Sequence, residues 1–182
     1  MKTVLLKEFK KDKSIRRSIL IEFLWEICNL AFFQNRFCIS SLFKTYILRI
    51  FGAKIGQNVV FKQNVKIKYP WKLTVGDYCW IAESVWIDNI VAVDIGANVA
   101  FAQGAFLTTG NHDWTKQDFP LMAKPIVIED GVWIGAKAIV GPGVRLRTHS
   151  ILSAGCVVTK STEPYGIYVG NPAVYVKERK IQ

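Results

Sequence analysis

Two histidines occur among the 182 residues, and one of them, His112, lies in the segment GNHDW at positions 110–114. An imidazole can remove the proton of a hydroxyl near neutral pH, because its pKa in model compounds is about 6.5. A hydroxyl activated in this way can attack a thioester, whose carbonyl oxygen then needs backbone N–H donors. From the residues alone, His112 is either such a base or an ordinary surface-loop histidine. No other candidate functional residue is predicted to lie near the second histidine, His149.

A six-residue repeat must position this histidine. Large apolar residues stand at the first position of each hexad, and the fifth position is mostly small or β-branched. An amphipathic helix does not have this period, so the repeat predicts a solenoid of short strands whose coils bury their apolar edges against one another. The first positions are Ile55, Phe61, Ile67, Val75, Ile81, Ile87, Ile95, Phe101, Leu107, Ile128, Ile134, Val140, Leu146, Leu152 and Val158.

The sequence also predicts features of the corners of the solenoid. The early coils are spaced by twenty residues instead of eighteen, which predicts bulged corners at residues 69–73 and 89–93. Asn111 falls on a predicted inward position, and the inserted loop 113–127 has a length that indicates function or disorder. Glycine at the second position predicts backbone angles that other residues avoid. These glycines are Gly56, Gly76, Gly96, Gly135 and Gly141.

The N-terminal region differs from the repeat. Residues 1–17 contain seven lysines and arginines against two acidic residues, and residues 18–33 are mostly apolar, with Glu22 and Glu26 as their only charged residues. This apolar stretch predicts a helix too short and too polar to cross about 30 Å of hydrocarbon, and no signal-peptide cleavage site follows it. It is predicted either to pack on the solenoid or a partner subunit, or to lie in a membrane interface beside the basic arm. A second helix is predicted over residues 43–51.

Composition sets the remaining limits. The chain has a net charge of +10 and 51% hydrophobic residues, and its length fits one domain with a small appendage. Its four cysteines lack the spacing of a zinc site or a disulfide framework, so we expect free thiols in a reducing cytosol. We expect neither a metal nor a nucleic acid as partner. The predicted division is an arm and helical segment at 1–51, a β-helix at 52–163 with its loop at 113–127, and a tail at 164–182.

Several motifs together resemble the hexapeptide-repeat acyltransferases. They are the hexads, GNHDW at 110–114, VWIG at 132–135, GPGV at 141–144, AGCVVTK at 154–160 and GNPA at 170–173. Residues 70–89, 108–114 and 124–144 resemble most the colanic-acid acetyltransferase (WcaF-like) branch, and the match covers about residues 45–179. The resemblance implies an all-β, left-handed parallel β-helix, here with an N-terminal helical arm. The pair Arg145 and Arg147 and the cysteine at Cys156 depart from the usual repeat.

The same resemblance implies roles for individual residues. His112 would be the general base, and Asp88 and Asn89 would bind hydroxyls of the acceptor, unless they only form a bulged corner. The backbone N–H groups of Ala136 and Ala154 would hold the thioester and pantetheine of coenzyme A. The phosphates of coenzyme A would meet Lys160 and either Lys177 or Arg179, unless these cations are only a solvated tail.

We therefore expect an enzyme that uses acetyl-CoA, without a metal, to O-acetylate a sugar or a lipid-linked oligosaccharide in exopolysaccharide biosynthesis. The resemblance also implies a homotrimer in the cytoplasm, and its N-terminal arm offers a contact with the inner face of the membrane. Alternatives are an acetyltransferase for another small hydroxyl or amino acceptor, and a non-catalytic binding solenoid. A γ-type carbonic anhydrase would need three histidines for zinc, whereas this chain has two on different coils.

Overall fold

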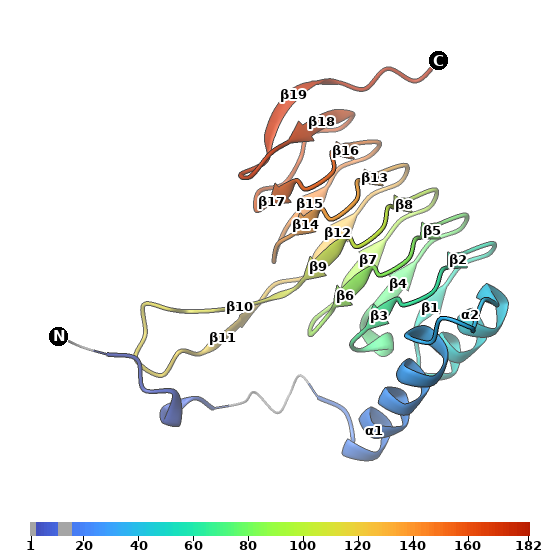
Figure 1. Ribbon diagram of the computed structural model, residues 1–182. Helices are drawn as coiled ribbons and strands as arrows, with labels where there is room; N and C mark the ends of the chain where they lie inside the picture. The colour runs from blue at the N-terminus through green and yellow to red at the C-terminus, as the bar shows by residue number, and fades with distance from the viewer. Residues whose placement is uncertain (1–2, 11–15) are drawn as a thin grey trace.

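The computed structural model describes residues 3–10 and 16–182. It is a prism of stacked coils, with two helices at one end, a hairpin projecting from one corner and the C-terminal strand at the other end (Figure 1). The predicted basic arm falls partly outside the described residues, because Lys2 and residues 11–15 are not among them.

Three sheets of short parallel strands form the sides of the prism, and the chain passes through sheets A, B and C in turn. Sheet A contains β1 (Lys54–Ile55), β4 (Leu73–Val75), β7 (Val93–Ile95), β12 (Ile126–Ile128) and β15 (Arg145–Leu146). Sheet B contains β2 (Val60–Phe61), β5 (Trp80–Ile81), β8 (Ala100–Phe101), β13 (Trp133–Ile134), β16 (Ile151–Leu152), β18 (Gly166–Val169) and the antiparallel β19 (Val174–Glu178). Sheet C contains β3 (Lys66–Ile67), β6 (Trp86–Asp88), β9 (Phe106–Thr108), β14 (Ile139–Val140) and β17 (Val157–Val158). This is the predicted left-handed parallel β-helix with an N-terminal helical arm.

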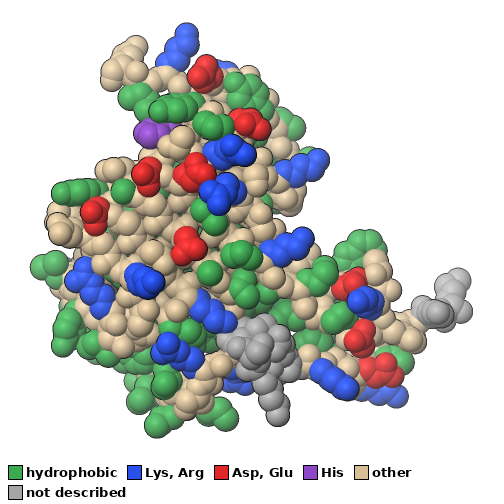
Figure 2. Space-filling view, turned by 180° about the vertical axis from the view of Figure 1, so that it is seen from behind, with side chains coloured by type: hydrophobic (Ala, Val, Ile, Leu, Met, Phe, Trp, Pro, Cys, Tyr) green, Lys and Arg blue, Asp and Glu red, His purple; other side chains and the backbone are tan. Residues whose placement is uncertain are grey.

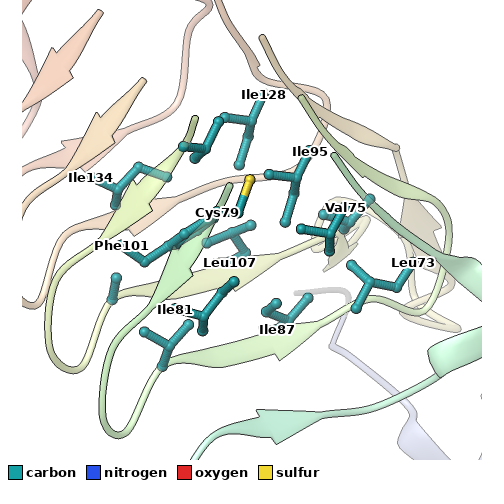
Figure 3. Packing of buried hydrophobic residues seen from close by; sticks show 14 of the residues in the cluster. Leu73, Val75, Cys79, Ile81, Ile87, Ile95, Phe101, Leu107, Ile128 and Ile134 are labelled. Carbon is teal, nitrogen blue, oxygen red and sulfur yellow. The ribbon is translucent and has the colours of Figure 1, made fainter. Parts of the chain in front are cut away.

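The inside of the prism is filled by the predicted inward positions (Figure 3). All the apolar residues at first hexad positions are buried, and they stack in register from coil to coil, as Ile81 does on Phe101. The fifth position of a hexad is also predicted to face inward. Counting from Ile67, Ile87 and Leu107, this prediction falls on Trp71, Val91 and Asn111, and there it is wrong, since none of the three is buried. All three follow sheet C at corners with extra residues. Where Trp71 and Val91 were expected, the inward position is instead taken by Leu73 and Val93.

Glycine at the second hexad position has a different cause from the one predicted. Left-handed backbone occurs at the fourth position, where Asn58, Asn98 and Lys137 have φ between 52° and 57°. At the second position, a Cβ on Gly135 would lie 2.5 Å from the carbonyl oxygen of Leu152 on the next coil. Glycine is therefore needed there because successive coils stack too closely for a side chain.

The helical cap consists of α1 (Ile19–Cys28), which continues into the π-helical turn η3 (Asn29–Phe33), and α2 (Ser41–Ile50). Both predicted helices are confirmed. Helix α1 packs on the first coil through Trp25, whose indole N–H donates to the Ile67 carbonyl at 2.9 Å. The fully buried Lys44 of α2 donates to the Lys62 carbonyl at 2.7 Å, and burial lowers the pKa of its ammonium. Among the described residues, no helix is long and apolar enough to cross a membrane.

The C-terminal part continues the solenoid past residue 163. Strand β18 pairs in parallel with β16, and β19 then folds back antiparallel on β18. The unusual arginines leave the local corner regular: Arg145 bonds Glu129 of the preceding coil at 2.8 Å, and the Arg147 N–H donates to Thr162. Short 3₁₀ turns occur at η1 (Leu6–Glu8) and at η4 (Pro70–Lys72), the latter within the first predicted bulge.

Close stacking at the corners can be tested with two second-position glycines. Gly135→Ala should lower the free energy of unfolding by about 1–3 kcal/mol, because its new methyl group would overlap backbone atoms. Gly141→Ala is the matched control, since its Cβ would meet nothing nearer than the Val158 carbonyl oxygen at 3.3 Å. Urea denaturation of both variants measures the difference, and equal midpoints would contradict the stacking explanation.

Candidate active site

The insertion that interrupts the repeat is an ordered hairpin at the corner where the chain passes from sheet C to sheet A. Its strands are β10 (Gly110–His112) and β11 (Leu121–Ala123), with His112 opposite Leu121. The hairpin, which we call the histidine hairpin, therefore begins before the predicted loop 113–127, and residues 126–127 already belong to β12. Asn111 is exposed on this hairpin, whereas Thr109 at its base is fully buried.

His112 is oriented by the other end of its own hairpin. Its Nδ1 lies 2.9 Å from the Phe119 carbonyl oxygen, and its ring stacks on the Phe119 ring at 4.5 Å with 9° between the planes. A carbonyl oxygen can only accept a hydrogen bond, so Nδ1 must carry the proton. The tautomer that results has a free lone pair on Nε2, as a general base requires.

A second aromatic contact to His112 comes from the N-terminal arm. The Phe9 ring lies 5.5 Å from the imidazole ring, and the Leu5 N–H donates to the Gln117 carbonyl at 2.8 Å. The arm therefore lies along the outer part of the histidine hairpin. Sequence reasoning missed Phe9, because an aromatic residue in a basic segment carries no local signal of a contact some hundred residues away.

The turn after His112 is held by Asp113. Its carboxylate accepts hydrogen bonds from the hydroxyl and the N–H of Thr115, at 2.5 and 3.1 Å. The hydroxyl bond is the main reason why the pKa of Asp113 is lowered, with smaller help from the N–H and from Lys116. Trp114 beside it is 73% exposed. Asp113 is thus ionised to support the turn, and its contacts give it no partner role toward the imidazole.

Asp88 lies on the coil below the hairpin, in register with Thr108. Its carboxylate pairs with Lys68 at 2.9 Å, and the Thr108 hydroxyl, 3.5 Å from it, also donates to Gly110 at the base of the hairpin. Asp88 opens into a pocket of about 270 Å³ between helix α1 and sheet C. Its other charged and aromatic lining residues include Glu26, Lys66, Lys68 and Trp86.

Asn89, predicted to bind the acceptor, has a structural role in the fold. Its side chain is fully buried, and its amide is used at both ends by one backbone segment. The Nδ2 group donates to the Tyr69 carbonyl at 2.7 Å, and Oδ1 accepts from the Tyr69 N–H at 3.0 Å. Asn89 therefore ties two bulged corners together, and it is not among the residues that line the pocket of Asp88.

Ala136 and Ala154 occupy equivalent places on successive coils, at the corner between sheets B and C. The Gly155 N–H donates to the Ala136 carbonyl at 2.8 Å, which joins the two turns. At the corner between sheets A and B, equivalent N–H groups on Gln57 and Ala97 are capped by aspartate carboxylates at 2.7 and 2.8 Å. No such acceptor faces the N–H groups of Ala136 and Ala154 within residues 3–10 and 16–182.

Of the cations predicted to meet phosphates, Lys177 and Arg179 line one pocket beside β19, whereas Lys160 lies at another corner. Lys160 is exposed at the corner after sheet C, and Lys177 is exposed on β19, at the edge of sheet B. Arg179 donates to the carbonyls of Gly131 and His149, at 2.9 and 3.3 Å, at the corner between sheets A and B. Arg179 thus holds this corner of the prism.

His149 has structural contacts. Its ring stacks on Tyr165 at 4.9 Å, and Nδ1 lies 2.7 Å from the Thr148 hydroxyl. The two histidines stand at different corners of the prism, and among the described residues no group of three or more His, Cys, Asp or Glu could hold a metal ion.

A pocket of about 210 Å³ lies where the histidine hairpin meets the following coils. It is lined by Asn111, Met122, Lys124, Gly141, Pro142 and Thr159. Side chains alternate along a strand, so Asn111 and His112 face opposite sides of β10. His112 is not among the lining residues, and the imidazole therefore opens to the other side of the hairpin.

A parallel β-helix with a histidine hairpin inserted at one corner is the architecture of a class of acyltransferases, and comparison with known proteins agrees. Residues 125–160 match the family model described as the hexapeptide repeat of succinyl-transferase. The chain is 42% identical over 136 residues to WcaF of Escherichia coli, which its name assigns provisionally to colanic acid biosynthesis as an acetyltransferase; the match covers 75% of each chain. It is 29% identical over 129 residues to the galactoside O-acetyltransferase of the same organism, covering 69% of this chain and 64% of that one.

Solved structures agree on the fold. A hexapeptide-repeat containing acetyltransferase of Vibrio cholerae, complexed with acetyl coenzyme A, superposes with a TM-score of 0.83 at 22% identity. The superposition covers 97% of this chain and 96% of that one. The chain belongs to the hexapeptide-repeat acyltransferase family, and it is an enzyme of the acetyltransferase kind.

The different roles of Asp88 and Asn89 can be separated by substitution. Asn89→Ala should lower the free energy of unfolding by about 1–3 kcal/mol, because it leaves the Tyr69 N–H without its acceptor and removes one of the two donors to the Tyr69 carbonyl, which keeps only the Lys72 N–H. Asp88→Asn is the neighbouring control and should change stability little, since the paired Lys68 is 43% exposed. Thermal unfolding measures both, and an Asn89→Ala protein of normal stability would restore the residue as an acceptor ligand.

Proposed function

We propose that this enzyme moves the acetyl group of acetyl-CoA to a sugar hydroxyl, in the biosynthesis of an exopolysaccharide. The observation that carries the proposal is the orientation of His112, whose Nδ1–H is held by the Phe119 carbonyl so that Nε2 is free to accept a proton. The use of acetyl coenzyme A by a related fold and the acetyltransferase name of WcaF support the donor and the reaction.

The imidazole takes part in two proton transfers, first as a base and then as an acid. Nε2 of His112 takes the proton of the acceptor hydroxyl while its oxygen attacks the thioester carbonyl. Backbone N–H groups stabilise the oxyanion, and the uncapped N–H groups of Ala136 and Ala154 are suited to bind the donor. The C–S bond then breaks, the thiolate of coenzyme A takes the proton from the imidazolium, and an acetyl ester remains on the acceptor.

Two features of sheet C favour a sugar as acceptor. The Asp88 carboxylate can accept hydrogen bonds from hydroxyl groups, and Trp86, 45% exposed in the same pocket, offers an apolar face to a pyranose ring. The name of WcaF favours a polysaccharide unit over another small acceptor. The four free cysteines are compatible with a cytoplasmic reaction, where acetyl-CoA would be the donor.

The base and the proposed donor site stand at different corners of one prism. His112 projects from the corner between sheets C and A, whereas Ala136 and Ala154 lie between sheets B and C. A site that needs both is completed when the hairpin of one subunit reaches the donor corner of its neighbour. Three prisms side by side, related by a threefold axis, would form three such sites, so we infer a homotrimer.

The trimer has a direct test. Multi-angle light scattering at micromolar concentration should give three times the chain mass of 20.6 kDa. A monomer that still turns over acetyl-CoA at full rate would contradict the shared site, because one prism does not bring His112 to the donor corner.

Removal of the base should lower turnover strongly and leave the binding of coenzyme A nearly unchanged. His112→Ala should lower kcat on the acceptor by about 10²–10⁴-fold, since a hydroxyl is a poor nucleophile until its proton is being removed. Binding of coenzyme A, measured by calorimetry, should change little because the donor contacts lie on other coils.

His149→Ala is the matched control for this experiment, and it should keep both the rate and the binding of coenzyme A. A folded His112→Ala protein with near-normal turnover of its acceptor would refute the mechanism, even though the fold and the family would stand.

A further inference from the structure

Helix α1 uses one side to pack on the prism and leaves a broad apolar face bare on the other. Trp25 and Asn29 face inward, where both side chains reach the Ile67 carbonyl at 2.9 and 3.4 Å. The outward residues have 46% to 78% of their surface exposed. They are Ile19, Leu20, Phe23, Leu24, Ile27 and Leu30, which we call the α1 apolar face. A contiguous exposed patch of this kind marks an interaction site.

The spacing of these residues makes the face continuous. Positions 19, 23, 27 and 30 are one helical turn apart, with positions 20 and 24 beside them. The two carboxylates of the helix lie at its edge, toward the prism: Glu22 pairs with Arg16, and Glu26 lines the pocket that holds Lys66 and Lys68. The α1 apolar face itself therefore has no charged side chain.

The segment that leads into α2 adds to the patch at the same end of the molecule. Phe37, Ile39 and Leu42 are 89%, 74% and 85% exposed. Figure 2 shows hydrophobic side chains gathered over the helical end, with lysine and arginine side chains among them.

Positive charge is concentrated at this same end. Residues 16–68, which enter α1 and form the helical cap and the first coil, contain nine lysines and arginines and two acidic residues, a net charge of +7. Residues 69–182 contain ten of each, so most of the net charge of +10 lies on the helical cap and the first coil. An apolar face flanked by basic residues is typical of a helix that lies in the headgroup region of an anionic bilayer.

We propose that the helical end of the prism docks on the surface of an anionic lipid bilayer, with the α1 apolar face inserted among the headgroups. The helix lies in the interface and does not span the bilayer, because no described helix is long enough to cross it. Docking of two copies through this face is disfavoured, since it would bring together two surfaces of the same positive charge.

Docking would also place the active site relative to the lipid. Phe9 contacts the imidazole of His112, and Phe9 and α1 belong to the same N-terminal segment. The proposal concerns binding alone and holds for any acceptor, and its test does not use turnover.

Co-sedimentation with vesicles tests the docking on the full chain. The protein should be retained by vesicles of phosphatidylglycerol and phosphatidylcholine at low salt, released in part at high salt, and retained far less by phosphatidylcholine alone. The triple variant Ile19→Ser, Phe23→Ser, Ile27→Ser should lower the partition coefficient about tenfold or more. Val174→Ser with Val176→Ser is the matched control on β19, where these residues are 55% and 52% exposed, and should bind as the wild type does.

A charge variant covers the case in which the triple variant does not fold. Arg36→Gln with Lys54→Gln should weaken retention several-fold at low salt and have little effect at high salt. Equal retention on neutral and anionic vesicles would overturn the proposal, as would wild-type retention of a folded triple variant. A triple variant that loses its oligomeric state while vesicle binding is unchanged would instead assign the α1 apolar face to a second copy of the chain.

Discussion

The structure depends on how closely one coil can rest on the next. Each coil has only two inward positions per side, and it can bury them only against the coils above and below. Glycine at the second hexad position lets the corners approach until no Cβ would fit, as Gly135 does beside Leu152. Asparagine, glycine or another residue in the left-handed region turns the chain at the fourth position. The strand register, the shape of the corners and the packing of the core thus depend on one another, and a change in any of them affects the other two.

The histidine hairpin interrupts the repeat without disturbing this stacking. Strand β12 pairs directly with β7, Ile128 beside Ile95, although the hairpin separates them in the sequence. The rigid coils before and after the insertion therefore hold both ends of the hairpin at one corner. Its own contacts, from Phe119 to the imidazole, then set the tautomer of His112. The solenoid fixes where the hairpin stands, and the hairpin supplies and orients His112.

The core and the fold could be predicted from the sequence because a buried position in a solenoid follows from local spacing. The prediction failed where the count of residues per coil changes, since two extra residues at a corner moved the inward position from Trp71 to Leu73. The role of Asn89 could not be read either, because an amide that pins a buried backbone and one that binds a ligand look alike in sequence. Contacts between distant segments, such as Phe9 on His112 and Arg179 on Gly131, have no local pattern at all.

The stacked coils between the hairpin and the C-terminal strand can change in number during evolution. A duplication of eighteen residues after β12 would add one whole coil and leave each corner and each inward pair as it was. Such an event would move the C-terminal Lys177 and Arg179 about 4.8 Å farther from His112, the spacing of neighbouring strands. Evolution could therefore lengthen the prism in fixed steps while the histidine hairpin stays unchanged.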